Sequence, residues 1–247
     1  MIRGIYSAAS GMLAGQTRLD TVAHNVANVN TTGYRRQEVT FAPLFQTELW
    51  RHGKDLAFIG RSSLGVKAAA LVTDLSAGPV TETGCATDLA LDGEGFFTVE
   101  RDGEFLYTRA GSFTVSADGY LVTRAGDPVL GMQGPLPVGD PHFTVTPDGQ
   151  VITSDGVELD RLLLTALPGG EGLERTREGY LAADREETQP AHATRVLQGY
   201  LEGANVSLAT EMVGLLLAAR VYAANQRLVR THDALVEKAI NQIGVLR

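Results

Sequence analysis

The chain has 247 residues, 44% of them hydrophobic and 20% charged, and a formal net charge of −8. The acidic balance argues against nucleic acid as a main partner, because phosphate binding needs clustered Lys and Arg. A single cysteine, Cys85, rules out an intrachain disulfide, and no run reaches the roughly 18 apolar residues of a membrane span, so no membrane insertion is expected.

The first 29 residues show a heptad pattern. One apolar series recurs every seven positions, at Ile5, Met12, Leu19 and Val26, and a companion series follows three positions later, at Ala8, Gly15, Val22 and Val29. So narrow a stripe is typical of a helix that packs against another helix. Gly4, Gly11 and Gly15 each weaken a helix by about 1 kcal/mol relative to Ala, but small residues let a second helix approach closely.

The phrase "HNVANVNTTGYRR" stands where this helical pattern stops. Asn30 to Gly33 suit a helix end, since Asn and Gly tolerate the left-handed conformation found there. Asn25 and Asn28 lie inside the periodic stretch, where a buried amide needs partners from a neighbouring segment. Such residues can set the register between helices.

Residues 31–85 read as an extended linker or long hairpin, and residues 86–197 as an antiparallel β domain. In the second region β-prone runs alternate with turn signals, notably Asp102-Gly103, Asp118-Gly119, Asp148-Gly149 and Asp155-Gly156. Asp-Gly between such runs favours type I′ hairpin turns, in which both central residues have positive φ.

Residues 198–247 hold a second helical pattern with no proline after Val206, which predicts a helix about 60 Å long. Asn205 is expected to cap its start. Its apolar positions are Leu208, Met212, Leu215, Ala219, Tyr222, Val229, Val236, Ile240 and Ile243, interrupted by Gln226 and Asp233. This helix is too long to cover the protein's own core alone, so a partner helix is expected, most simply the one within residues 1–30.

The charge differs between these regions. Residues 1–28 carry a net +1 and residues 206–247 a net +2, which leaves −11 for residues 29–205. Slightly basic ends and an acidic middle predict two different environments.

Three phrases together resemble the bacterial flagellar rod and hook family. They are "NVANVNTTGYRR" near the N-terminus, "DLALDGEGFFTV" with "YTRAGSFTVSADGYLVTRAGDPVLG" in the middle, and "LQGYLEGANVSLATEMVGLLLAARVYAANQR" near the C-terminus. The likeness runs along nearly the whole chain and is weakest from about 45 to 80. His24, Ala204 and Ala219 depart from the usual pattern, and the short segment 44–65 leaves open a distal or a proximal rod position.

The resemblance implies an α+β fold in which the N- and C-terminal helices pair as an antiparallel coiled coil and the middle forms an antiparallel all-β domain. It implies a structural subunit of the flagellar basal-body rod, polymerising into a helical tube that transmits torque and surrounds the export channel. Copies of itself, other rod and hook subunits, the flagellar export apparatus and bushing rings are its expected partners. Export without a cleaved signal peptide is expected, to a site in the cell envelope. The expected assembly residues are Ile5, Met12, Leu19, Val22, Asn25, Val26, Asn28, Asn205, Leu208, Met212, Leu215, Arg220, Tyr222, Asn225, Val229, Val236 and Ile240.

No catalytic, cofactor or metal site is expected. The five histidines, His24, His52, His142, His192 and His232, show no metal-ligand spacing, and Cys85 has no paired cysteine. The alternative function is a cell-wall-acting enzyme or carbohydrate-binding β domain. It would need a carboxylate pair, for which Glu94, Glu100 and Glu104 are the candidates, and it would not explain apolar helices at both ends.

Overall fold

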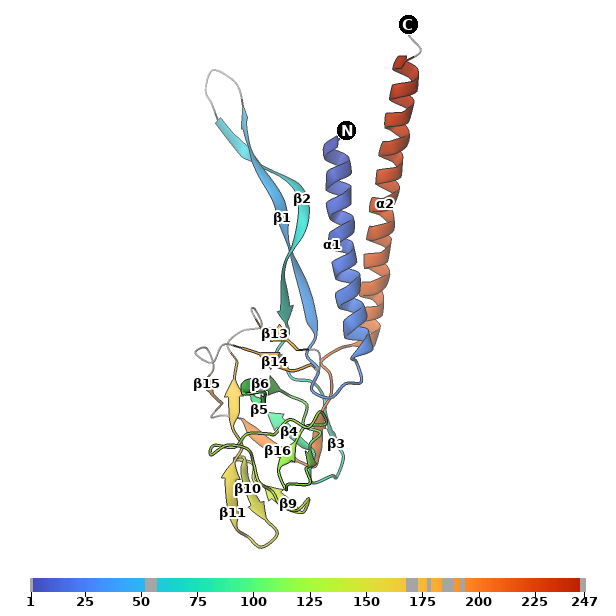
Figure 1. The fold of residues 1–247 in the computed structure, drawn as a ribbon. Helices are drawn as coiled ribbons and strands as arrows, with labels where there is room; N and C mark the ends of the chain where they lie inside the picture. The colour runs from blue at the N-terminus through green and yellow to red at the C-terminus, as the bar shows by residue number, and fades with distance from the viewer. Residues whose placement is uncertain are drawn as a thin grey trace. The chain divides into compact units, whose positions relative to one another are not determined.

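The computed structural model describes residues 2–51, 57–167, 173–176, 179–183, 189–191 and 194–244 (Figure 1). The chain forms two compact units. The helical unit comprises Met1–Val26, Gln37–Leu71 and Leu208–Arg247, and the β unit comprises Ala27–Arg36 and Val72–Ser207. The predicted α+β fold, with terminal helices packed together and a central antiparallel β region, is confirmed.

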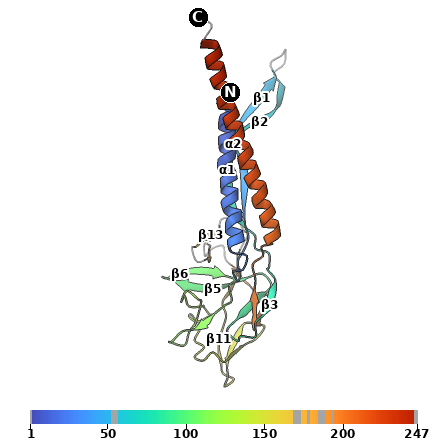
Figure 2. The same ribbon diagram turned by 90° about the vertical axis from the view of Figure 1, so that its right-hand side faces the viewer.

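In the helical unit, α1 (Ile2–Ala27) and α2 (Leu208–Gly244) lie side by side in both views (Figures 1 and 2). They contain 26 and 37 residues, or about 39 and 56 Å at the usual rise. Gly4 faces His232, Gly11 faces Asn225, and Gly15 faces Tyr222, so the helices run in opposite directions.

Glycine on α1 makes this approach possible. A Cβ atom placed at Gly4 would lie 2.7 Å from His232 Nε2, and one at Gly11 would lie 2.8 Å from Asn225 Nδ2. These glycines lower the intrinsic stability of α1, and the close packing between the helices offsets that loss.

A long hairpin completes the helical unit. Strands β1 (Gln37–Arg51) and β2 (Ala57–Thr73) pair as a two-stranded sheet, in which Thr40 donates to the carbonyl of Ala70 at 3.2 Å. The hairpin contacts α1 where Val66 N–H donates to Ser10 Oγ at 3.2 Å. Most of its large apolar side chains are exposed, including Phe45 at 66% and Ile59 at 62%.

The β unit is built from short antiparallel strands. A six-stranded sheet has the order β13-β14-β6-β5-β12-β15 and a three-stranded sheet the order β11-β10-β9, and the two-stranded pairs are β16-β4, β17-β3 and β7-β8. The bounds are β3 Val80–Glu82, β4 Leu89–Asp92, β5 Phe96–Arg101, β6 Glu104–Thr108, β7 Thr114–Val115, β8 Leu121–Val122, β9 Phe143–Val145, β10 Gln150–Thr153, β11 Glu158–Arg161, β12 Leu164–Ala166, β13 Glu174–Arg175, β14 Leu181–Ala182, β15 Gln189–Pro190, β16 Arg195–Gln198 and β17 Tyr200–Glu202.

Strand β5 separates two apolar clusters of the β unit because its side chains alternate between the faces of the sheet. Phe97 and Val99, both fully buried, belong to the main core. Phe96 belongs to a second, smaller cluster. On that second face Thr98 and Thr165 share a hydrogen bond of 2.9 Å between their hydroxyls.

The four Asp-Gly pairs all lie at turns between consecutive strands, but only one turn has the predicted type. Asp102 and Gly103 have φ of 53° and 83° between paired Arg101 and Glu104, as type I′ requires. At the other three, only the glycine has positive φ, and its N–H donates three residues back, to Ser116, Thr146 or Thr153. The type I′ prediction is wrong there, because these loops are longer than two residues and suit a type I turn followed by a left-handed glycine.

Candidate assembly interface

The contact between α1 and α2 follows the companion series of α1, which contains Ala8, Gly15 and Val22. Ala8 and Val22 are buried, at 5% and 9% exposure, and Gly4, Gly11 and Gly15 continue the same face. The other predicted series, Ile5, Met12, Leu19 and Val26, is only half-buried. Those four side chains flank the intrachain seam and keep apolar surface for a further contact.

On α2 the predicted residues fall into two groups. Tyr222 and Asn225 face α1 and are half-buried. The half-buried group also contains Leu215, Val229 and Val236. The exposed group contains Leu208 at 45%, Met212 at 55% and Ile240 at 66%, together with Arg220.

A second apolar stripe on α2 was missed by the sequence reading. It consists of Val213, Leu217, Val221, Leu228 and Leu235, each between 51% and 57% exposed, and is called the outer stripe below. Tyr6 and Leu13 on α1, at 73% and 68%, and Leu216 on α2 are also exposed. The signal was available, because the consecutive leucines 215–217 lie about 100° apart on a helix and cannot all face one partner.

Asn25 joins three elements of the helical unit. It is 1% exposed. Its Nδ2 donates to the carbonyl of Gln37 at 2.8 Å and to Glu211 Oε2 at 3.3 Å, and its Oδ1 accepts from Gln37 N–H at 3.0 Å. Glu211, 3% exposed, lies in the first turn of α2, where a carboxylate also suits the helix dipole. Asn25 therefore fixes the end of α1 against the starts of β1 and α2.

Asn28 serves the end of α1. Its carbonyl accepts from Thr31 N–H at 3.0 Å and its Oδ1 accepts from the Thr31 hydroxyl at 3.2 Å. Gly33 has the expected positive φ, 66°.

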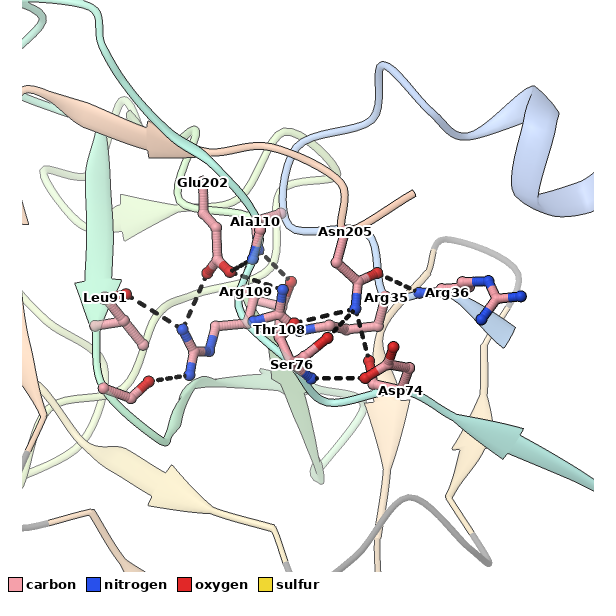
Figure 3. Close-up of polar contacts among 12 residues, drawn as sticks. Arg35, Arg36, Asp74, Ser76, Leu91, Thr108, Arg109, Ala110, Glu202 and Asn205 are labelled. Carbon is pink, nitrogen blue, oxygen red and sulfur yellow. Dashed lines mark hydrogen bonds and ion pairs between the residues drawn. The ribbon is translucent and has the colours of Figure 1, made fainter. Parts of the chain in front are cut away.

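A buried ionic cluster lies in the β unit (Figure 3). Glu202 accepts from Arg35 Nη1 at 2.7 Å and from Arg109 Nη1 at 3.0 Å, and the side chains of all three are at most 3% exposed. Burial lowers the pKa of Arg109, while the charge of Glu202 acts in the opposite direction. Arg109 is anchored further by donating to the carbonyls of Leu91 and Gly93. One carboxylate thus pairs with two buried guanidinium groups.

The cluster unites the three phrases that carry the family resemblance. Arg35 comes from "GYRR", Arg109 from "YTRAG" and Glu202 from "LEGAN". Arg35 and Glu202 are 167 positions apart in the sequence. From the sequence the three residues could be recognised only as members of these phrases, since a charged residue in a motif does not reveal its partner.

Asn205 lies beside this cluster (Figure 3). Its Oδ1 accepts from Arg36 N–H at 2.6 Å, and its Nδ2 donates to the carbonyls of Asp74 and Ser76 at 3.0 Å each. The prediction that Asn205 caps α2 is wrong, because α2 begins at Leu208 and the Asn205 side chain is engaged by other segments. Burial of Asp74 acts to raise its pKa, but hydrogen bonds from Ser76 and the charges of Arg36 and Arg35 leave that pKa below its ordinary value.

Little in the β unit suggests catalysis. Glu100 pairs across the β5–β6 ladder with Phe105, and Glu104 pairs with Arg101, so these two carboxylates are not directly opposite. Within the described ranges no group of three His, Cys, Asp or Glu side chains could hold a metal ion. His52 and His192 lie outside those ranges. Cys85 is exposed.

Neither described helix has the length and apolar character needed to cross a membrane.

Three family models match the chain in order. The flagella basal body rod protein model matches residues 5–35, the flagellar hook protein FlgE/F/G D1 domain model matches residues 90–153, and the flagellar basal body rod FlgEFG protein C-terminal model matches residues 197–243. The second covers much of the β unit, and the third covers nearly all of α2.

Curated relatives agree over almost the full length. The flagellar basal-body rod protein FlgG of Agrobacterium fabrum is 33% identical across 94% of this chain and 96% of its own length. FlgG of Bacillus subtilis is 30% identical, with 98% and 99% covered. FlgF of Caulobacter vibrioides is 31% identical, with 99% of both chains covered. The resemblance found in the sequence is confirmed, and the chain belongs to the flagellar basal-body rod protein family.

Proposed function

We propose that this chain is a structural subunit of the bacterial flagellar basal-body rod and polymerises through its terminal helices into a helical tube. Its relatives are named basal-body rod proteins, and the family is structural rather than catalytic. The observation that carries the mode of assembly is the outer stripe, an exposed apolar surface along a helix whose other face already packs on α1.

Burial drives the assembly we propose. Leu217, for example, is 51% exposed in the single chain, and covering apolar surface contributes about 25 cal/mol per Å². Contiguous apolar surface of this kind marks an interaction site. A neighbouring copy of the same helix pair would cover the outer stripe, together with exposed Leu208, Met212 and Ile240. In this tube α1 and α2 would supercoil as an antiparallel coiled coil.

The remaining predicted partners and locations extend this proposal. The subunit would join other rod and hook subunits in the basal body, surround the export channel and transmit torque. It would reach the cell envelope through the flagellar export apparatus without a cleaved signal peptide and rotate inside bushing rings. The runner-up, a cell-wall-acting enzyme, gives no role to the outer stripe.

Leu217→Asp tests the proposal in a strain that lacks the chromosomal gene. The charge would enter a dry contact between subunits, so we expect non-motile cells with shortened or missing rods by electron microscopy. The matched control is Gln226→Asp, which adds the same residue to an exposed position of α2 outside the outer stripe. It should restore swimming.

Circular dichroism of the purified Leu217→Asp monomer should match the parent, because the side chain is half exposed before assembly. Normal rods built from Leu217→Asp would refute the interface. A gene-deletion strain that swims with normal rods would refute the rod function itself, and attention would turn to the β unit as an enzyme or carbohydrate-binding domain.

A further inference from the structure

The chain passes between the two units four times, and on the β-unit side these crossings adjoin three short segments. The chain crosses at residues 26–27, 36–37, 71–72 and 207–208. The β-unit segments that contain these crossings are 27–36, 72–79 and 203–207, called the exit segments below. Any force carried along the chain from one unit to the other must therefore pass through an exit segment.

Glu202 binds two exit segments at once. Its Oε1 accepts from Arg35 Nη1 in segment 27–36 and from Gly78 N–H in segment 72–79, both at 2.7 Å. Its carbonyl accepts from Gly33 N–H at 2.8 Å. Glu202 is itself the residue just before segment 203–207, so all three exit segments meet at this side chain.

Asn205 repeats the arrangement with its amide. It accepts from Arg36 in the first exit segment and donates to Asp74 and Ser76 in the second, as described above. Backbone bonds tie the same segments, from Asp74 N–H to the Arg36 carbonyl and from Gly203 N–H to the Pro79 carbonyl, each at 2.8 Å. The packing is tight, since a Cβ atom at Gly78 would lie 2.1 Å from the Gly203 carbonyl oxygen.

We propose that Glu202 and Asn205 form a clamp that makes the three exit segments one mechanical element, anchored to the β unit by Arg109. Arg109 supplies the anchor because it joins Glu202 to the carbonyls of Leu91 in β4 and Gly93 just after it. Glu202, Arg35 and Arg109 are buried, so a partial opening at this end of the clamp would leave buried charged groups unpaired. Asn205 is half-buried and ties the same exit segments at the edge of that network. The exit segments then open together or not at all.

Hydrogen exchange of the purified full-length chain tests this coupling without assuming any cellular function. Asn205→Leu keeps the branched shape of the side chain but removes the amide bonds to both neighbouring exit segments. We expect exchange of the Arg36, Asp74 and Gly78 amides to rise together by about tenfold or more. The amide of Val99 in β5 should be unchanged.

Asp127→Asn is the matched control. It weakens a polar cluster of the same β unit, where Asp127 pairs with Arg101 at 2.6 Å, but this cluster contains no exit segment. Exchange in the exit segments should not respond to it. An Asn205→Leu effect confined to Arg36 would refute the clamp, and so would an equal rise throughout the β unit.

Glu202→Gln supplies a second variant, since it keeps the shape of the side chain and removes the carboxylate charge that pairs directly with both Arg35 and Arg109. It should accelerate the same three amides at least as strongly. Unchanged exchange in this variant would contradict the central role given to Glu202.

The mechanical role rests on the proposed function, and cells test it separately. With Asn205→Leu we expect rods of normal length, and a greater loss of swimming speed in viscous medium than in dilute medium. Equal speeds to the parent in both media would refute a role in carrying torque. Absent rods would show that the clamp is needed for assembly and would refute its separate mechanical role. The hydrogen-exchange result on the monomer would still test the coupling of the exit segments independently.

Discussion

The prediction that most sharply tests the reading of the Asn-rich phrase is the replacement of Asn25 by Ala. The change removes three hydrogen bonds at a site that is 1% exposed, two of them to the backbone of Gln37 and one to Glu211. Gln37 is itself only 8% exposed, so its N–H and carbonyl would lose their partners away from bulk water.

The magnitude follows from those groups. A buried polar group left unsatisfied costs about 1–3 kcal/mol, and two backbone groups and a carboxylate are affected. Because such costs are not additive and water can enter the space left by the amide, we expect a loss of about 3 kcal/mol in the free energy of opening at this site. That corresponds to a roughly hundredfold larger population of the open state.

Hydrogen exchange of the full-length monomer measures this directly, at the amides of the last turns of α1 and at the start of β1. The matched control is Asn30→Ala, which removes an exposed amide from the same phrase and should change the opening free energy by less than about 0.5 kcal/mol. Equal effects of the two substitutions would show that Asn25 does not organise the junction of α1, β1 and α2.

Two further predictions concern the β unit. Gly33→Ala should destabilise it by about 4 kcal/mol or more in denaturant titration, because φ is 66° and the new Cβ would lie 2.2 Å from Ala110 N. The control is Gly103→Ala, which also has positive φ but has open space around it, and it should cost only about 1–2 kcal/mol. Similar losses of stability at both sites would contradict the packing argument. The pKa of Asp127 is lowered, chiefly by its hydrogen bond from Arg101 and against the effect of burial, so its contribution to stability is present above the unfolded pKa of about 3.9 and is lost as the pH falls through the lower folded pKa. Denaturant titration of the parent and of Asp127→Asn should therefore show a smaller stability difference below pH 4 than at pH 7. A constant difference would show that the carboxylate charge is not what stabilises this cluster.

Local patterns predicted the elements of this fold well. Heptad spacing indicated both terminal helices, and the spacing of Gly4, Gly11 and Gly15 indicated close approach of a partner helix. Asp-Gly pairs marked the turns of the β unit. These signals are local, because helix periodicity and turn chemistry depend on residues a few positions apart.

Choices between equivalent faces of a helix could not be made from the same signals. The stripe predicted on α2 included Leu215 and left out Leu217. Only the packed pair shows that Leu215 is half-buried while Leu217 remains exposed at 51%. Which stripe meets α1 depends on the fit of Tyr222 and Asn225 against glycines more than 200 positions away, and no local pattern contains that information.

The hydrogen bonds of Asn25 and Asn205 explain why similar Asn-containing phrases stand beside both terminal helices. Asn25 of the first phrase binds the start of β1 and the first turn of α2, within the helical unit. Asn205 of the second phrase binds the residue that follows Arg35, within the β unit. Each amide therefore joins segments that enter or leave the terminal helices. An amide suits this task because it can donate and accept at once, whereas an apolar residue would leave the backbone groups of three converging segments unpaired. The two phrases resemble each other because each supplies an amide that pairs the backbone groups of converging segments, once in each unit.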